Sequence, residues 1–418
     1  MLRIGISLCV IASSAAILSA ENWPGWRGPG GQGHTAETKL PLTWSPTENI
    51  RWKVALPDDG NSTPVVWGDR IFLTQAIGKA ADSKRMLWCL DRATGKKHWE
   101  QAVTYTPKEP THATNPYCSA SPVTDGERVV VSYGSAGLYC YDFTGKELWH
   151  RDYGSMDHIW GNASSPIIYQ DLVIFWGGPG EKQFLVGLNK KTGEDVWRHD
   201  EPGGASGIGN SKDWVGSWST PVVIRVADHD ELVLGVPLKL KSFDPKTGKE
   251  LWSCAGLGKL VYTSPVFADG VVVAMSGYGG PALACKVGGS GDVTSTHRLW
   301  HHPRNTQRIG SPVIVGEHVY IVEENGVPHC FELKTGKEIW GASERATGTT
   351  WSATVAAGDR LYVGSHTGDV VVYKADPKKF ESLARNRLGE RMLSSVAVAD
   401  GDLLVRTYKN LWCISAKK

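Results

Sequence analysis

Nine residues of this chain could hold a ligand without reacting with it. They are large aromatics, arginines, asparagines and a histidine at or near matching points of a repeated pattern: Asn61, His158, Trp160, Asn162, Trp218, Tyr262, Arg308, Trp351 and Arg391. Aromatic faces stack on flat rings, and arginine pairs with anionic groups through parallel hydrogen bonds. The set predicts a site for a flat anionic ligand. The simpler interpretation, which we favour, is that these side chains only fill a central channel.

Other chemistries find little support in the sequence. The stretch WGGPGEKQ at 176–183 lacks the Gly-Lys-Ser/Thr ending of a phosphate-binding loop, and the histidines show no HExxH spacing. We therefore expect no catalytic residue and no metal ligand. The formal charge of +2, without a basic run, argues against nucleic acid as a partner.

A repeated nine-residue phrase indicates which structural elements position these residues. It occurs as DRATGKKHW at 91–99, NKKTGEDVW at 189–197, DPKTGKELW at 244–252 and ELKTGKEIW at 332–340. A shortened copy occupies 142–149, and a degenerate copy without the Thr-Gly pair ends at Trp300. Self-similarity at a fixed period is the signature of repeat architectures.

A second repeated phrase gives the number of repeat units. Each unit begins with a Ser/Thr-Pro step and a β-branched run, followed by a Gly/Asp turn. The starts are Pro64, Pro122, Pro166, Pro221, Pro265 and Pro312, with weaker copies at Thr354 and Val396. These eight starts recur at the length of a propeller blade, so the sequence predicts an all-β chain folded as an eight-bladed β-propeller.

Four strands are expected in each unit, and the first unit shows how. Residues 65–67 form the innermost strand a, 71–74 strand b and 86–90 strand c, and the Thr94-Gly95 corner leads into strand d. Glycine supplies a positive φ at the corner, and the tryptophan of strand d lays a flat ring against its neighbour. The repeated tryptophans are Trp52, Trp99, Trp149, Trp197, Trp252, Trp300 and Trp340, and the corner glycines are Gly95, Gly145, Gly193, Gly248 and Gly336.

The ring should close through both ends of the chain. The last unit ends at 411–418 with no corner and no outer strand, whereas NIRWKVAL at 49–56 is an outer strand without a unit. Pairing the two removes an exposed sheet edge. We expect the last blade to contain this N-terminal strand.

The propeller geometry then locates a funnel. Loops between strands b and c, and between strand d and the next strand a, should emerge on one face. The residues three positions before each start should rim the axis there: Asn61, Ser119, Ala163, Trp218, Tyr262, Ile309, Trp351 and Leu393. Because loops on a rigid scaffold carry most binding residues, this face is the expected functional surface.

The chain is divided into three parts by composition. Residues 1–20 have a basic start, an apolar stretch and small residues before Glu21, which predicts a signal peptide and export, with no membrane span. Residues 21–48 form an N-terminal extension, and 49–418 a single propeller. Seven cysteines would remain after cleavage. Most occupy strand c positions that favour a small buried side chain, so we expect free thiols rather than disulfides.

Two sequence phrases of this chain resemble those of a known family. The Ala/Cys-x-Asp-x-x-Thr-Gly-x-x-x-Trp phrase is similar to the tryptophan-docking motif of pyrroloquinoline-quinone (PQQ) type propellers, and the likeness covers roughly residues 50–415. The head NWPGWRGPGGQG at 22–33 resembles the WPxWRGP opening of secreted bacterial PQQ-binding-like repeat proteins. The resemblance implies the propeller fold and an exported protein.

The family contains enzymes and binding modules. Quinoprotein alcohol dehydrogenases carry adjacent cysteines beside the quinone, and this chain has none. The propeller subunit of the outer-membrane barrel assembly machinery has eight blades and binds partners through its loops, although the lipid-attachment motif is absent here. We expect a non-catalytic binding or scaffold module for a protein, an extracellular polymer or a small ligand, without a required cofactor. The alternative is a PQQ-dependent oxidoreductase with calcium.

Overall fold

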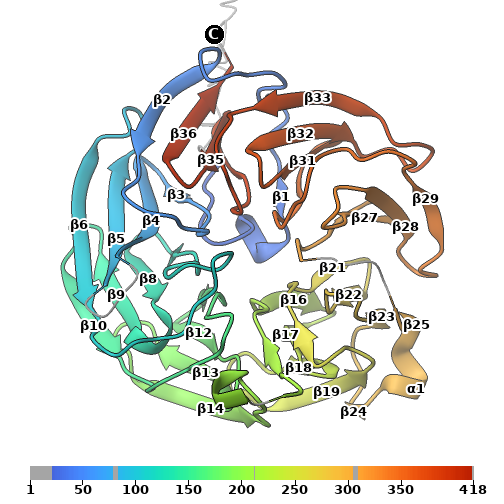
Figure 1. The fold of residues 1–418 in the computed structure, drawn as a ribbon. Helices are drawn as coiled ribbons and strands as arrows, with labels where there is room; N and C mark the ends of the chain where they lie inside the picture. Colours follow the sequence, from blue (N-terminus) through green and yellow to red (C-terminus); the bar gives the residue numbers. More distant parts are fainter. Residues whose placement is uncertain (1–20, 79–82, 211, 305–308, 417–418) are drawn as a thin grey trace, which may run out of the picture.

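Eight blade sheets formed by the described strands are arranged around a central axis (Figure 1). The computed structural model describes residues 21–78, 83–210, 212–304 and 309–416, and the expected signal peptide at 1–20 lies outside these ranges. Each sheet contains four antiparallel blade strands. The predicted eight-bladed β-propeller is confirmed.

Blades 1 to 4 are built from consecutive strands. Blade 1 contains β3 (Val65–Trp67), β4 (Arg70–Ile77), β5 (Lys84–Asp91) and β6 (Lys97–Thr104). Blade 2 contains β7 (Val123–Thr124), β8 (Arg128–Ser132), β9 (Leu138–Asp142) and β10 (Glu147–Arg151). Blade 3 contains β11 (Ile167–Tyr169), β12 (Leu172–Gly177), β13 (Gln183–Asn189) and β14 (Asp195–Glu201). Blade 4 contains β16 (Val222–Val226), β17 (His229–Val236), β18 (Lys239–Phe243) and β19 (Glu250–Ala255).

Blades 5 to 8 complete the ring. Blade 5 contains β21 (Val266–Ala268), β22 (Val271–Met275), β23 (Ala282–Lys286) and β25 (Arg298–His302). Blade 6 contains β26 (Val313–Val315), β27 (His318–Val322), β28 (Pro328–Glu332) and β29 (Glu338–Gly341). Blade 7 contains β30 (Val355–Ala357), β31 (Arg360–Gly364), β32 (Asp369–Lys374) and β33 (Ser382–Arg387). Blade 8 contains β34 (Ala397–Ala399), β35 (Asp402–Arg406), β36 (Asn410–Ser415) and β2 (Ile50–Ala55).

The remaining elements are short. They are β1 (His34–Thr35), β15 (Gly216–Ser217), β20 (Leu260–Val261), β24 (Gly291–Asp292), the helix α1 (Thr294–His297) and the 3-10 turns Pro29–Gly31, Gly134–Ala136 and Ile208–Asn210. Within the described ranges, no helix has the length and apolar character needed to cross a membrane.

The hydrophobic core is divided among the blade interfaces. One cluster, for example, joins Val130 and Trp149 of blade 2 to Val173 and Val186 of blade 3. Similar clusters lie between the other neighbouring blades. Each blade is therefore stabilised chiefly by burying apolar surface against the next one.

Five of the seven repeated tryptophans dock on a corner glycine of the next blade, as the sequence predicts. Trp149 donates its indole N–H to the carbonyl oxygen of Lys190 in the next blade at 3.0 Å, and Gly193 lies directly over its ring. Trp52, Trp99, Trp197 and Trp300 lie in the same way under Gly95, Gly145, Gly248 and Gly336. A side chain at such a glycine would overlap the indole. The tryptophan therefore requires a glycine at the neighbouring corner.

The interface between blades 4 and 5 departs from this pattern, as does that between blades 6 and 7, where no described glycine lies over Trp340. Blade 5 lacks the Thr-Gly corner, and Trp252 turns its indole N–H to the buried carboxylate of Glu231 in its own blade at 2.7 Å. The degenerate segment instead supplies β24, which pairs in parallel with β19. The lost corner is thus replaced by an added strand.

The ring closes through the N-terminal strand, as predicted. β2 pairs antiparallel with β36, with Trp52 opposite Cys413 and Val54 opposite Leu411. The buried guanidinium of Arg406 reinforces the junction by donating to the Thr74 carbonyl oxygen at 2.8 Å. Blade 8 is therefore built from both ends of the chain and leaves no open edge at the closure.

The segment 22–37, which we call the plug, lies across the ring axis (Figure 1). It contacts inner residues of seven blades, and the partners are Val66, Thr124, Val222, Phe267, Pro312, Ala356 and Gly401. Asn22 caps the strand a to strand b turn of blade 1 at Gly68, so the plug lies toward that end of the axis. The sequence predicted an extension here but not its position.

Arg27 anchors the plug. Its side chain is fully buried and donates to the carbonyl oxygens of Gln32 at 2.9 Å and Pro312 at 2.5 Å. Burial lowers the pKa of the guanidinium to about 9. Gly33 lies where a side chain would overlap this guanidinium. The conformation of the plug is therefore fixed by its own buried Arg27.

All seven described cysteines are buried free thiols. Cys89, Cys140, Cys330 and Cys413 each lie opposite the tryptophan of their blade. Cys285 lies one residue further along its strand c, because Ala284 takes the place opposite Trp300 and Cys285 pairs with Arg298.

Substitution of a docking glycine tests the tryptophan contact. In Gly248→Ala the new Cβ would lie 2.3 Å from the Trp197 ring at a φ of +69°. We expect a loss of about 1 kcal/mol from the positive φ and about 1–3 kcal/mol more from overpacking, measured as a lower urea midpoint. Gly270→Ala is the matched control, because its φ is +72° and nothing lies within 4 Å of its Cβ. Equal losses in both variants would contradict the docking role.

Thiol titration tests the state of the cysteines. Burial raises the pKa of Cys89, Cys140 and Cys330 to about 12, which suppresses the reactive thiolate. We expect the chain without residues 1–20 to show no thiol reactive toward Ellman's reagent when native, and seven after denaturation. A count of five would reveal a disulfide, and Cys254 and Cys285, which share the hydrophobic cluster between blades 4 and 5, would be the first pair to map.

Candidate functional site

The funnel is a cavity of about 170 Å³ on the axis. All eight positions expected to rim it lie in its wall, namely Asn61, Ser119, Ala163, Trp218, Tyr262, Ile309, Trp351 and Leu393. They converge because each follows a loop that enters the axis just before a strand a. Whether they bind a ligand stays a prediction.

A belt of hydroxyls forms the narrow end of the funnel. The residue before each unit start is serine or threonine in seven blades, and its side-chain oxygen accepts the backbone N–H of the matching residue in the preceding blade. The acceptors are Ser121, Ser165, Thr220, Ser264, Ser311, Ser395 and Thr63, at 2.8–3.3 Å. Blade 7 has Ala353 here, so the belt is interrupted between blades 6 and 7. The belt links neighbouring blades at the axis.

An aromatic wall covers one side of the funnel. β15 pairs in parallel with β20, so that Ser217 lies opposite Val261. The residues that follow, Trp218 and Tyr262, are thereby held side by side, with ring centroids 4.9 Å apart and planes within 9°. The Trp218 indole N–H donates to the Gly161 carbonyl oxygen at 2.8 Å. The stack is therefore fixed before any ligand arrives.

Trp160 extends this wall outward. Its centroid lies 4.8 Å from Trp214 in an edge arrangement and 6.0 Å from Tyr278 in a stacked one. Tyr278 lines both the funnel and a second open cavity of about 490 Å³ that also contains Trp214. We call Trp160, Trp214 and Tyr278 the shelf. The wall and the shelf form one continuous aromatic surface.

A buried ion pair holds the loop that faces this wall. Glu109 is 4% exposed and pairs with Arg85 at 3.2 Å, while its other oxygen accepts Ser135 N–H and the Asn162 amide. The loop it anchors carries Asn115, whose amide donates to the Trp160 carbonyl oxygen at 2.6 Å. The long connection after blade 1 is thus tied to the loop that carries Trp160.

The other predicted site residues lie outside the wall. His158 is fully buried behind it, with its ring 4.9 Å from Trp218. Asn162 lines a smaller neighbouring cavity, and the Arg391 guanidinium lies over the Tyr408 ring at 5.1 Å. Arg308 falls outside the described residues.

Sequence reasoning missed several parts of the funnel. The floor contains Trp26 of the plug, and the wall contains Tyr278 and five belt hydroxyls, those of Ser121, Ser165, Thr220, Ser311 and Ser395. The hydroxyls were visible in the sequence as the Ser/Thr before each start. No signal of comparable regularity marks Trp26 or Tyr278.

The funnel does not suit the calcium-bound quinone that the resemblance implies for the enzymes. None of its described lining residues is Asp, Glu, Lys or Arg. Calcium prefers several oxygen ligands with carboxylates among them, and an anionic quinone needs counter-charges. Tryptophan, tyrosine and serine supply neither. The described part of the lining therefore does not fit this cofactor.

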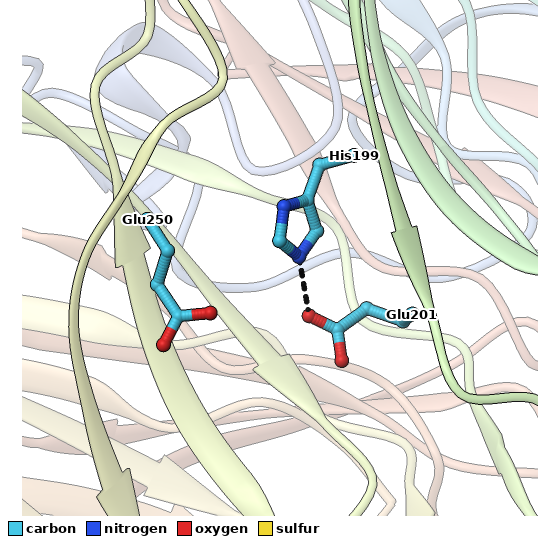
Figure 2. Close-up of side chains that lie close together, drawn as sticks. All are labelled: His199, Glu201 and Glu250. Atoms are coloured by element: carbon cyan, nitrogen blue, oxygen red, sulfur yellow. Dashed lines mark hydrogen bonds and ion pairs between the residues drawn. The ribbon is translucent and has the colours of Figure 1, made fainter.

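A possible metal cluster lies away from the funnel (Figure 2). Of the described residues, only His199, Glu201 and Glu250 bring three potential ligand atoms together, within 4.8 Å. The Lys241 ammonium already pairs with Glu201 and lies 3.0 Å from Glu250. Burial alone would raise the pKa of Glu201, but hydrogen bonds from His199 and Lys241 lower it. The group is an ion-pair cluster that joins blades 3 and 4.

Comparisons with known proteins place the fold among propellers. A family model described as outer membrane protein assembly factor BamB matches residues 88–342 and 334–417. BamB from Moraxella catarrhalis is similar with a TM-score of 0.62 at 16% identity, over 88% of this chain and 98% of that one. A comparison with curated proteins gives no match.

Two solved dehydrogenases are also similar. A europium-containing methanol dehydrogenase has a TM-score of 0.70 at 12% identity, over 94% of this chain and 90% of that one. The quinohemoprotein alcohol dehydrogenase from Comamonas testosteroni has a TM-score of 0.60 at 14% identity, over 95% and 81%. At these identities the likeness shows the fold alone.

The buried histidine behind the wall predicts an acid-sensitive site. Burial lowers the pKa of His158 to about 4, from about 6.5 in the unfolded chain. Between these values the unfolded chain binds a proton that the folded one does not, so stability falls as the pH drops from about 6.5 to 4. We expect His158→Phe to remove on the order of 3 kcal/mol of this loss at pH 4, measured by urea unfolding across the pH range. An unchanged pH dependence in the variant would contradict this role.

Proposed function

This chain belongs to the propeller family described as outer membrane protein assembly factor BamB, and on that premise we propose that it is an exported, non-catalytic binding or scaffold module. The proposed binding surface is the funnel with its aromatic wall and shelf. Export rests on the predicted signal peptide at 1–20, and the partner is a protein or an extracellular polymer.

One observation supports this function above the others. Apart from His112, the described funnel lining combines stacked aromatics, hydroxyls and amides, and it contains no carboxylate, lysine or arginine. Proton transfer at neutral pH needs a group with a suitable pKa beside the reacting atom. Burial raises the pKa of Tyr262 far above its ordinary range, and the His112 ring is already hydrogen-bonded to the Thr114 hydroxyl at 2.7 Å. Such a surface favours binding over chemistry.

The rigidity of the funnel also supports a binding role. The plug closes one end of the axis, and the belt hydroxyls and the Glu109–Arg85 pair hold the loops at the other. A preformed surface costs little conformational entropy when it binds. The loop face can therefore recognise a partner without rearranging.

The alternative, a PQQ-dependent oxidoreductase, is tested by titrating the tryptophan fluorescence of the mature protein with PQQ, with and without calcium. We expect no saturable quenching and no dye reduction with alcohols, because the described lining lacks the ligands for this cofactor. Calcium-dependent quenching that is abolished by Trp218→Ala or Arg308→Ala would overturn the proposed function.

Partner binding is tested by retention from envelope extracts on the immobilised protein. Tyr278→Ala removes an aromatic ring that is 46% exposed at the funnel, and Val196→Ala removes a side chain that is 54% exposed on the outer strand β14. We expect the first variant to lose the retained partner and the second to keep it, because only the first alters the funnel face. Loss in both or in neither would place the binding surface elsewhere.

A further inference from the structure

The belt hydroxyls have unused hydrogen-bonding capacity at the funnel. Each accepts one backbone N–H, and its own O–H has no acceptor among the described residues. Five of them line the funnel: Ser121, Ser165, Thr220, Ser311 and Ser395. Their hydrogens can therefore be donated to a ligand on the axis. The narrow end of the funnel is a ring of hydrogen-bond donors.

The lack of formal charge restricts the ligand. A belt hydroxyl can donate its hydrogen or offer its remaining lone pair, but none carries the negative charge that would offset the desolvation of a cation. An anion would be desolvated without a counter-charge among the described lining residues. A neutral ligand rich in oxygen acceptors avoids both costs.

The aromatic wall adds a second requirement. Trp218 and Tyr262 present parallel faces, and the negative face of an aromatic ring attracts weakly polarised C–H groups. The ligand should therefore have one flat apolar face beside its oxygen acceptors. Asn61 and Asn115 supply amide groups elsewhere in the funnel lining. A neutral sugar ring, with C–H groups on its faces and hydroxyls around its edge, meets both requirements.

The shelf extends the surface beyond one ring. Trp214 is 37% exposed and Tyr278 is 46% exposed, and the second cavity between them continues from the funnel toward blades 4 and 5. Lys259 and Asp213 form an ion pair at its margin. A single sugar would leave this aromatic surface uncovered, whereas a linear chain would cover it.

We propose that the funnel and shelf bind the end of a linear neutral glycan, with the terminal sugar against Trp218 and Tyr262 and the following sugars along Trp160, Trp214 and Tyr278. This inference rests on the proposed function, because it names the polymer that the same loop face would hold. The belt hydroxyls donate to the oxygens of the terminal sugar.

The test is calorimetric titration of the mature protein with cello-, malto-, laminari- and chito-oligosaccharides of one to six units. We expect at least one series to bind, with affinity rising about tenfold or more between one and four units as the shelf becomes covered. Trp214→Ala should abolish this rise and leave the affinity for the single sugar within about twofold. Val196→Ala should bind as the unaltered protein does.

Trp218→Ala should abolish binding of every length. Because Trp218 is mostly buried, the folding of the Trp218→Ala variant is checked by circular dichroism. If that variant misfolds, the Trp214→Ala variant still tests the proposal, because Trp214 is exposed. The proposal of a glycan ligand would be overturned by absence of binding in all four series, or by a length dependence that Trp214→Ala leaves unchanged. Binding of an oligoproline decamer at this face in place of the sugars would overturn it in favour of a peptide.

The outcome separates the two proposals. A partner retained from extracts through Tyr278, together with no sugar binding, would overturn the glycan and leave the binding module standing. Calcium-dependent quinone binding would overturn both.

Discussion

The ring depends chiefly on one contact, repeated at five blade interfaces, in which a tryptophan lies flat on the corner glycine of the next blade. At Gly193 the backbone has a φ of +73°, and its missing side chain leaves the space that Trp149 occupies. At each of the five interfaces that share this contact, the relative orientation of the two blades is set by the same local geometry. Repetition of one angle closes the ring and brings the loops before each inner strand to a common axis. The funnel is a consequence of that packing.

The sequence predicts this architecture well, because period and turn chemistry are local. Pro64 and its counterparts mark each inner strand, so a count of three residues back was enough to find Trp218 and Tyr262 on the axis. Closure by residues 50–55 followed from a missing outer strand. These features depend on backbone position, which repeats.

What could not be predicted has no repeat. The plug contacts seven blades through different residues, so no internal comparison reveals it, and Trp26 reaches the funnel only through that fold. Arg391 was expected at the funnel, but its side chain lies over Tyr408, a contact set by one particular loop. The belt hydroxyls were seen only as markers of unit starts. Their shared hydrogen-bonding role requires adjacent blades in three dimensions.

The composition of blade 8 determines when its strands can pair during synthesis. Ile50 pairs with Ile414, so the first blade strand must wait for almost the last residues before it acquires a partner. The entropic cost of closing such a long loop grows only slowly with length, but the event comes late because the contact is remote. A growing chain consequently carries two unpaired sheet edges, one at each end of an incomplete arc. The final strand converts an aggregation-prone intermediate into a shape without ends.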